Sequence, residues 1–128
     1  MAVPYAVIEK GMPNNPAAPK KFYAQAKSSG ELTFKKLVKE ICDGGSTVSD
    51  TDVMAVLNEM IKIMRRHLDE GKIVRFGDFG TFQTSFKSKG AETEAKFNAS
   101  LIHSPKIMFR PGADLKAMLN NLKYTKEK

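Results

Sequence analysis

The side chains best able to do chemistry in this sequence are cations, and they are concentrated after residue 71. Residues 72–128 carry eleven basic and five acidic side chains, whereas residues 31–71 carry six and eight. Residues 1–30 carry four and one, and the net charge of the whole chain is +7. Lysine and arginine pair with phosphate oxygens, and clusters of them attract polyanions. This segregation favours a polyanionic partner such as nucleic acid over a surface that only confers solubility.

Catalytic and metal-binding patterns are absent from the sequence. His67 falls in a helical segment, His103 in an extended one and Cys42 elsewhere, and no spacing resembles a metal site or a nucleophile–base pair. No glycine-rich phosphate loop occurs. We therefore expect no enzymatic activity, no cofactor, no metal and no small-molecule substrate.

The sequence also indicates a compartment. One cysteine cannot cross-link the fold, so Cys42 is expected to be a buried structural thiol in a reducing cytoplasm. No stretch has the length of a membrane span, and the first residues lack the features of a secretory signal. We expect a single cytoplasmic domain, with an extension, that has no membrane partner.

The stretch Gly71–Phe82, GKIVRFGDFGTF, predicts the hairpin from which the cations are presented. Its apolar run at Ile73, Val74 and Phe76 is typical of a short strand. Gly77-Asp78 predicts a two-residue reversal with glycine where a positive φ is needed, and the second strand follows from Phe79.

Beyond this hairpin the sequence predicts a β-arm at about residues 83–110. Ser85–Lys89 and Ile102–Phe109 have strand character, and the polar segment Gly90–Glu94 predicts a turn between them. A two-stranded ribbon is marginally stable alone. We therefore expect its root to be ordered in the free protein and its tip to become ordered only when a ligand is bound.

Helices are predicted on either side of the hairpin. Thr33 is placed to cap a helix that Gly44-Gly45 ends, and Ser49 opens a second helix that ends at Gly71. After Pro111-Gly112, a last short helix is predicted from the apolar residues Leu115, Met118, Leu119 and Leu122.

The second helix has an apolar face that is too wide for its neighbours. That face comprises Val53, Val56, Leu57, Met60, Ile61, Met64 and Leu68, widened by Met54 and Ile63. A second copy of the chain would cover it, so we predict an obligate homodimer in which helix 50–70 packs across a two-fold axis. The alternative is a monomer in which the N-terminal residues fold over this helix.

The two ends of the chain are expected to be appendages. Residues 1–30 form an N-terminal extension, predicted as a loose β-hairpin because strand-like PYAVIEKG and KKFYAQAK flank the proline-rich GMPNNPAAP. A disordered basic arm is the alternative. Residues 31–123 form the main domain, and residues 124–128 are expected to be a frayed tail.

Three pieces of the sequence resemble the HU and integration host factor family of bacterial histone-like DNA-binding proteins. They are the helix-ending Gly71, the FGTF of Phe79–Phe82, and the Phe109–Gly112 turn before Leu115-Lys116. They stand in the order helix, helix, hairpin, basic ribbon, short helix over residues 31–122, and extended variants of the family are similar at the N-terminus. The resemblance implies an α+β fold: an intertwined helical dimer body with a three-stranded antiparallel sheet and protruding β-ribbon arms.

The same resemblance implies that the arms enter the minor groove of double-stranded DNA. The expected DNA-binding residues are Lys87, Lys89, Lys96, Lys106 and Arg110 on the arm, Lys72, Arg75 and Thr81 at its root, and Lys116 and Lys123 on the last helix. No helix carries a cluster able to read the major groove, so binding should be largely independent of sequence.

One departure from the family concerns the arm tip. The family's arm usually ends in Arg-Asn-Pro, whose proline wedges between base pairs, but GAETEAKFNAS here has no proline. Phe97 is a candidate replacement wedge, and packing on the ribbon or body is its alternative role. Glu92 and Glu94 would repel phosphate.

Together with the distribution of charge, this resemblance implies a histone-like, nucleoid-associated dimer that bends or compacts DNA. The alternative function is a structural or protein-interaction dimer on the same fold with weak or no DNA binding. The choice between homodimer and heterodimer with a homologous subunit, and between DNA and RNA, stays open.

Overall fold

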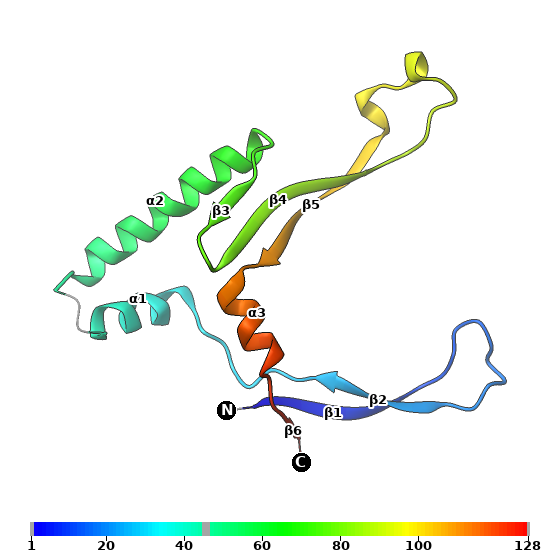
Figure 1. Cartoon of the computed structure of the whole chain (residues 1–128), viewed down its shortest axis with the longest axis horizontal. Coiled ribbons are helices and arrows are strands. Elements are labelled where there is room, and N and C mark those ends of the chain that lie inside the picture. Colours follow the sequence, from blue (N-terminus) through cyan, green and yellow to red (C-terminus); the bar gives the residue numbers. More distant parts are fainter. Residues whose placement is uncertain (1, 45–46, 128) are drawn as a thin grey trace.

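The computed structural model describes residues 2–44 and 47–127, which form three α-helices and two small sheets (Figure 1). This mixed α+β composition agrees with the prediction. The elements are β1 (Val3–Lys10), β2 (Lys21–Ala26), α1 (Phe34–Asp43), α2 (Asp50–Asp69), β3 (Val74–Phe76), β4 (Gly80–Ser88), β5 (Ile102–Pro111), α3 (Ala113–Asn120) and β6 (Tyr124–Lys126). One sheet has the strand order β2-β1-β6 and the other β3-β4-β5.

The first two helices begin at the residues that were predicted to cap them. The Lys36 amide donates to Thr33 Oγ1 at 3.2 Å, and the Asp52 amide donates to Ser49 Oγ at 3.2 Å. Each bond satisfies an amide that has no partner inside its helix. The predicted stop at Gly44-Gly45 cannot be followed fully, because Gly45 lies outside the described residues.

The β3–β4 hairpin has a longer turn than predicted. Phe76 pairs with Gly80, so residues 77–79 connect the strands in place of the predicted two-residue reversal. Gly77 does adopt a positive φ of +54°. The third residue is Phe79, whose ring packs against those of Phe76 and Phe109 at centroid distances of 5.9 and 5.5 Å. This packing draws Phe79 into an aromatic cluster and its backbone out of the strand.

β4 and β5 pair antiparallel and extend away from the helices as a long ribbon (Figure 1). The register shifts by one residue between Ser85 and Lys87, and the extra residue lies on β5 where Ser104 adopts a φ of +54°. Such a bulge bends a strand and increases its twist. Residues 89–101 connect the strands through two single-turn 3₁₀ helices, Glu94–Lys96 and Ala99–Leu101, instead of the simple polar turn predicted at Gly90–Glu94.

The first sheet joins the two ends of the chain. β1 and β2 form an antiparallel hairpin, and β6 pairs parallel with the free edge of β1. The Val3 amide donates to the Lys123 carbonyl at 2.8 Å, and the Glu127 amide donates to the Tyr5 carbonyl at 2.7 Å. The prediction of a frayed tail is therefore wrong for residues 124–127, and Lys128 lies outside the described residues. Pairing satisfies backbone groups on an edge of β1 that would otherwise be open.

α3 is shorter than predicted at its C-terminal end. Asn121 caps it, with its amide donating to the Met118 carbonyl and its side-chain Nδ2 to the Ala117 carbonyl. Lys123 therefore lies in the link between α3 and β6, which corrects its assignment to the last helix.

The core of a single chain is small. Val38 of α1 and Val53 of α2 are 3% and 7% exposed, and no other side chain in the described part of the chain is buried. Val56 and Ile61, on the predicted apolar face of α2, are 66% and 48% exposed. The β1–β2 hairpin lies far from α2 (Figure 1). The N-terminal residues therefore do not cover this helix, which was the packing that the monomeric alternative required.

Candidate nucleic-acid interface

The β3-β4-β5 sheet separates an apolar face from a polar one. Side chains alternate along a strand, so Phe82 and Thr84 lie on one face and Thr81, Gln83 and Ser85 on the other. The Thr84 hydroxyl donates to the Leu68 carbonyl of α2 at 3.1 Å, which identifies the Thr84 face as the one toward the helix. The Thr81 face therefore points away from α2.

Three predicted site residues form a row across this outward face. Arg75 of β3 pairs with Thr81 of β4, which pairs with Arg110 of β5. They line a shallow hollow of about 120 Å³, whose other lining residues are Ile73, Gln83 and Met108. Two guanidinium groups that flank a hydroxyl are a suitable arrangement for phosphate oxygens, since arginine can bind phosphate bidentately.

Further predicted cations continue the outward face along the ribbon. Lys106 pairs with Ser85, and Lys87 pairs with His103 beyond the bulge. Lys89 follows β4, and its amide donates to the Leu101 carbonyl at 2.9 Å. Among the residues that the structure describes, none of these lysines forms an ion pair, and neither do Arg75 and Arg110. Their charges are available to an external anion.

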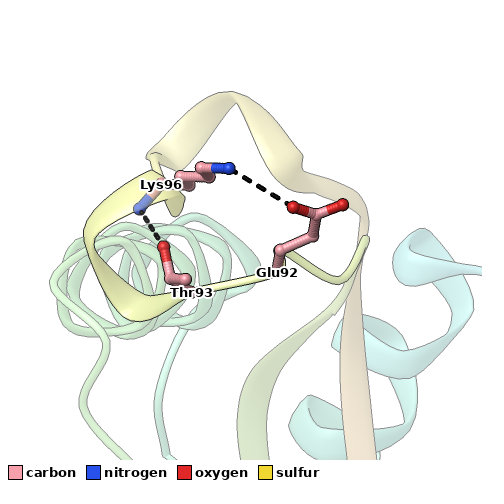
Figure 2. A network of polar contacts seen from close by, with 3 residues as sticks. All are labelled: Glu92, Thr93 and Lys96. Atoms are coloured by element: carbon pink, nitrogen blue, oxygen red, sulfur yellow. Dashed lines mark hydrogen bonds and ion pairs between the residues drawn. The ribbon is translucent and has the colours of Figure 1, made fainter.

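The cation nearest the tip is different, because it has an internal partner. Lys96 Nζ lies 3.3 Å from Glu92 Oε2, and the Lys96 amide donates to Thr93 Oγ1 (Figure 2). Phe97 follows as the residue that ends the first 3₁₀ helix, and its side chain is 42% exposed. The tip therefore presents an exposed aromatic ring beside a neutralised lysine.

Lys72, at the root of the hairpin, is also paired. Its Nζ lies 3.0 Å from Glu70 Oε2. A hydrogen bond from Lys72, followed by its charge, holds the pKa of Glu70 below its ordinary value. Both side chains are well exposed, so the pair adds little to stability. Lys116 lies on α3 and Lys123 follows it in the chain; α3 begins at the end of β5 that is opposite the ribbon tip (Figure 1).

Two glycines of the motifs allow the ribbon root to close. A Cβ on Gly80 would lie 2.5 Å from the Arg110 carbonyl oxygen and 2.5 Å from the Phe109 ring, and one on Gly112 would collide with the Asp78 carbonyl. The Gly112 amide donates to the Phe79 carbonyl at 2.9 Å. Glycine is thus required where the FGTF turn meets the start of α3.

Gln83 and Ser85 share the outward face but were missed from the sequence. Both lie at two-residue intervals from Thr81 along β4, and residues two apart in a strand lie on the same face. The sequence alone could therefore have identified them. Gln83 also lines the hollow between the two arginines.

Within residues 2–44 and 47–127, no cluster of His, Cys, Asp or Glu could hold a metal ion. Cys42 is half-buried, which corrects its assignment as buried, and it lies in the last turn of α1 near the start of α2. A hydrogen bond with Asp50, reinforced by desolvation, raises the pKa of the Cys42 thiol to about 11, so the nucleophilic thiolate is scarce at neutral pH. In the same ranges no helix combines the length and apolarity that a membrane span needs.

Two capped helices, of which α2 lies against one face of a three-stranded sheet, are combined here with a cationic outer face and ribbon, and these features define an HU-like domain. The chain belongs to the HU-HIG family, described as an HU domain fused to a wHTH, Ig or glycine-rich motif, and the match covers residues 1–126. The β1–β2 hairpin and β6 thus fall within the extent of the match.

A solved structure is similar over almost the whole chain. It is described as a "putative bacterial DNA binding protein" from Bacteroides vulgatus ATCC 8482. The TM-score is 0.65 at 12% identity, and the similarity covers 99% of this chain and 50% of that chain. This chain therefore spans about half the length of that protein, and the likeness concerns the fold. No curated protein matches the sequence.

Proposed function

We propose that this chain forms a homodimer that binds double-stranded DNA largely without sequence preference, and bends or compacts it with β4–β5 arms in the minor groove. The supporting observation is the row of Arg75, Thr81 and Arg110 on the outward face, continued by lysines without ion pairs. Such a protein would act in the nucleoid of a bacterial cytoplasm.

In the proposed complex the sheet and the ribbon have different roles. Arg75, Thr81 and Arg110 would hold phosphates against the body, where contacts position a protein on the duplex without reading bases. Lys87 and Lys106 would follow the groove, whose negative potential is highest where it is narrow. Phe97, whose side chain is exposed at the tip, would insert at a base step and kink the duplex, although Lys96 beside it is paired with Glu92.

The proposed dimer would complete the body. One copy exposes 10984 Å², whereas a compact monomer of this size exposes about 6,800 Å². Two hollows of about 490 and 660 Å³ run along α2, and their lining is mostly apolar: Val56, Met60, Ile63 and Met64 in the first, Ile61, Leu68, Phe82 and Ile107 in the second. Open apolar hollows against a helix are typical of an obligate interface cut in half.

Sedimentation at micromolar concentration tests the dimer. We expect the wild type to sediment as a dimer and Val56→Glu with Ile63→Glu to be monomeric or unfolded, because both side chains line the same hollow. Val7→Glu is the control, since Val7 is a similarly exposed apolar residue on the N-terminal hairpin. A wild type that is a stable monomer would exclude the dimer.

Binding of a labelled mixed-sequence duplex, followed by fluorescence anisotropy over a range of salt concentrations, tests the DNA-binding proposal. Replacing Lys87, Lys89 and Lys106 with Ala should weaken binding and reduce the slope of log K against log salt by about 0.9 for each phosphate that is no longer neutralised. Lys35, Lys36 and Lys39 on α1 provide the control, since the same replacement there removes equal charge from exposed positions. Undetectable or salt-insensitive binding, or a decrease in affinity confined to one sequence, would overturn the proposal.

The second candidate function is a structural or protein-interaction dimer on the same fold with weak or no DNA binding. The observation that favours it is the Glu92–Lys96 pair, which removes a cation from the tip where the deepest DNA contact is expected. Wild-type protein that fails to bind any duplex at low salt, yet sediments as a dimer, would support it.

A further inference from the structure

The distal end of the N-terminal hairpin carries a second group of cations. Lys10, the last residue of β1, pairs directly with Lys21, the first residue of β2. Lys20 precedes Lys21, and its side chain lies beside Gly11, where an added Cβ would be 3.7 Å from Lys20 Cγ. All three lysines are exposed. Three exposed lysines thus lie where the hairpin opens into its loop.

This arrangement is unfavourable for the isolated hairpin. Like charges directly opposite on paired strands repel each other. Among the residues that the structure describes, none of the three lysines has a carboxylate partner, and the neighbouring Glu9 forms no ion pair either. An external anion would relieve the repulsion.

The position of the hairpin relates it to the proposed DNA-binding surface. Its loop and the tip of the β4–β5 ribbon both extend away from α1 and α2 (Figure 1). β6 fixes the base of the hairpin to the end of α3, which itself starts where β5 ends. The exposed Lys116 and Lys123 lie along this connection. Cations therefore continue from Arg110 at the ribbon root to the base of the hairpin, and Lys10, Lys20 and Lys21 form a separate group at its far end.

The hairpin loop is also stiffened. Residues 11–20 include Pro13, Pro16 and Pro19, whose rings fix φ. Met12 and Asn15 form a bridge across the loop, with the Asn15 amide donating to the Met12 carbonyl at 3.2 Å. A loop that is already ordered loses less entropy when it binds.

We propose that the β1–β2 hairpin is a second DNA-contacting arm, in which Lys10, Lys20 and Lys21 bind phosphates of the same duplex that the β4–β5 ribbon holds. This inference rests on the proposed function. The hairpin would extend the contact along the phosphate backbone and would leave the grooves to the ribbon.

The test compares three triple variants in the same anisotropy titration, with each variant checked for folding by circular dichroism. Lys10→Gln, Lys20→Gln and Lys21→Gln together should reduce the salt slope by about 0.9 for each phosphate released, or about 2.7 per copy if all three lysines bind. The corresponding Arg variant keeps the charge and should retain the wild-type slope. Lys35→Gln, Lys36→Gln and Lys39→Gln remove the same charge from α1 and should leave the slope nearly unchanged.

The outcomes separate this inference from the function on which it rests. If the wild type binds DNA and the Gln variant of Lys10, Lys20 and Lys21 has the same salt slope, the proposal that the β1–β2 hairpin contacts DNA is overturned, while the DNA-binding proposal stands. An equal decrease in the α1 variant also overturns the hairpin proposal, because the effect would then follow net charge. Absence of wild-type binding overturns the DNA-binding proposal itself. The Gln variant removes a repulsive pair, so it should fold at least as well as the wild type.

Discussion

The two hairpins of this protein are held in place by different forces. Side-chain contacts hold the root of the β4–β5 ribbon. The Phe109 ring packs against those of Phe82 and Phe79 at centroid distances of 4.8 and 5.5 Å, and the Thr84 hydroxyl donates to the α2 backbone. The β1–β2 hairpin has no comparable aromatic cluster among the described residues, and every residue of β2 is exposed. The base of the β1–β2 hairpin is held by backbone hydrogen bonds between β1 and the chain segment around β6.

Because of this difference, we expect the two hairpins to differ in their stability against local opening. Each aromatic contact at the ribbon root contributes about 0.5–1.5 kcal/mol beyond the area it buries, in addition to the backbone hydrogen bonds of the strands. The ribbon should therefore resist local opening, whereas the N-terminal hairpin should open more readily and depend on the chain end that pairs with it.

The largest expected effect is at the ribbon root. Gly80→Ala places a methyl group against the Arg110 carbonyl and the Phe109 ring, so strands β4 and β5 must separate. We expect a decrease of about 3 kcal/mol in the free energy of unfolding, measured by urea denaturation.

Gly90→Ala is the matched control, because a Cβ there meets no atom within 4 Å. Its stability should stay within about 0.5 kcal/mol of the wild type. Equal stability of the Gly80→Ala and Gly90→Ala proteins would show that close packing at the root does not hold the ribbon.

A smaller effect is expected from removing the last strand. Deleting the chain from Tyr124 onward takes away β6 and the Glu127 amide that bonds to Tyr5. Amide exchange in β1 and β2 should then accelerate by roughly 10-fold or more, since one or two net hydrogen bonds of about 1 kcal/mol are removed. Exchange in β4 and β5 is the internal control and should not change. Acceleration in both hairpins alike would mean that they open as one unit.

The elements with local signals could be predicted from the sequence. Thr33 and Ser49 cap their helices as predicted, because a cap depends on one side chain and an amide three residues away. The β4–β5 pairing followed from composition and from a resemblance, but its bulge at Ser104 did not, since a register shift depends on both strands together.

Pairing between distant segments could not be predicted in the same way. Residues 124–126 have no strong strand pattern of their own, and they become a strand because α3 delivers them to the open edge of β1. The pairing of Lys96 with Glu92 is local, yet it depends on the 3₁₀ turn that Thr93 caps. Of the predicted cations, the structure brings Arg75 and Arg110 together through the sheet register, which the separate motifs did not reveal.

The smallest expected effect concerns the ribbon tip, which differs from the hairpin loop in having an ion pair. Glu92→Gln should free Lys96 at little cost, since an exposed pair contributes at most about 1 kcal/mol. If Lys96 then binds a phosphate, the salt slope of DNA binding should steepen by about 0.9. Glu94→Gln is the control, because it removes the same charge from the same tip but Glu94 forms no ion pair with Lys96. Comparing the two variants distinguishes release of Lys96 from a general gain in positive charge. A steeper slope in Glu92→Gln alone would mean that the pair limits how deeply the ribbon tip engages DNA. Equal steepening in both variants would reflect the general gain in positive charge, whereas wild-type slopes in both would place the tip outside the contact and leave the sheet face and hairpin loop to hold the duplex.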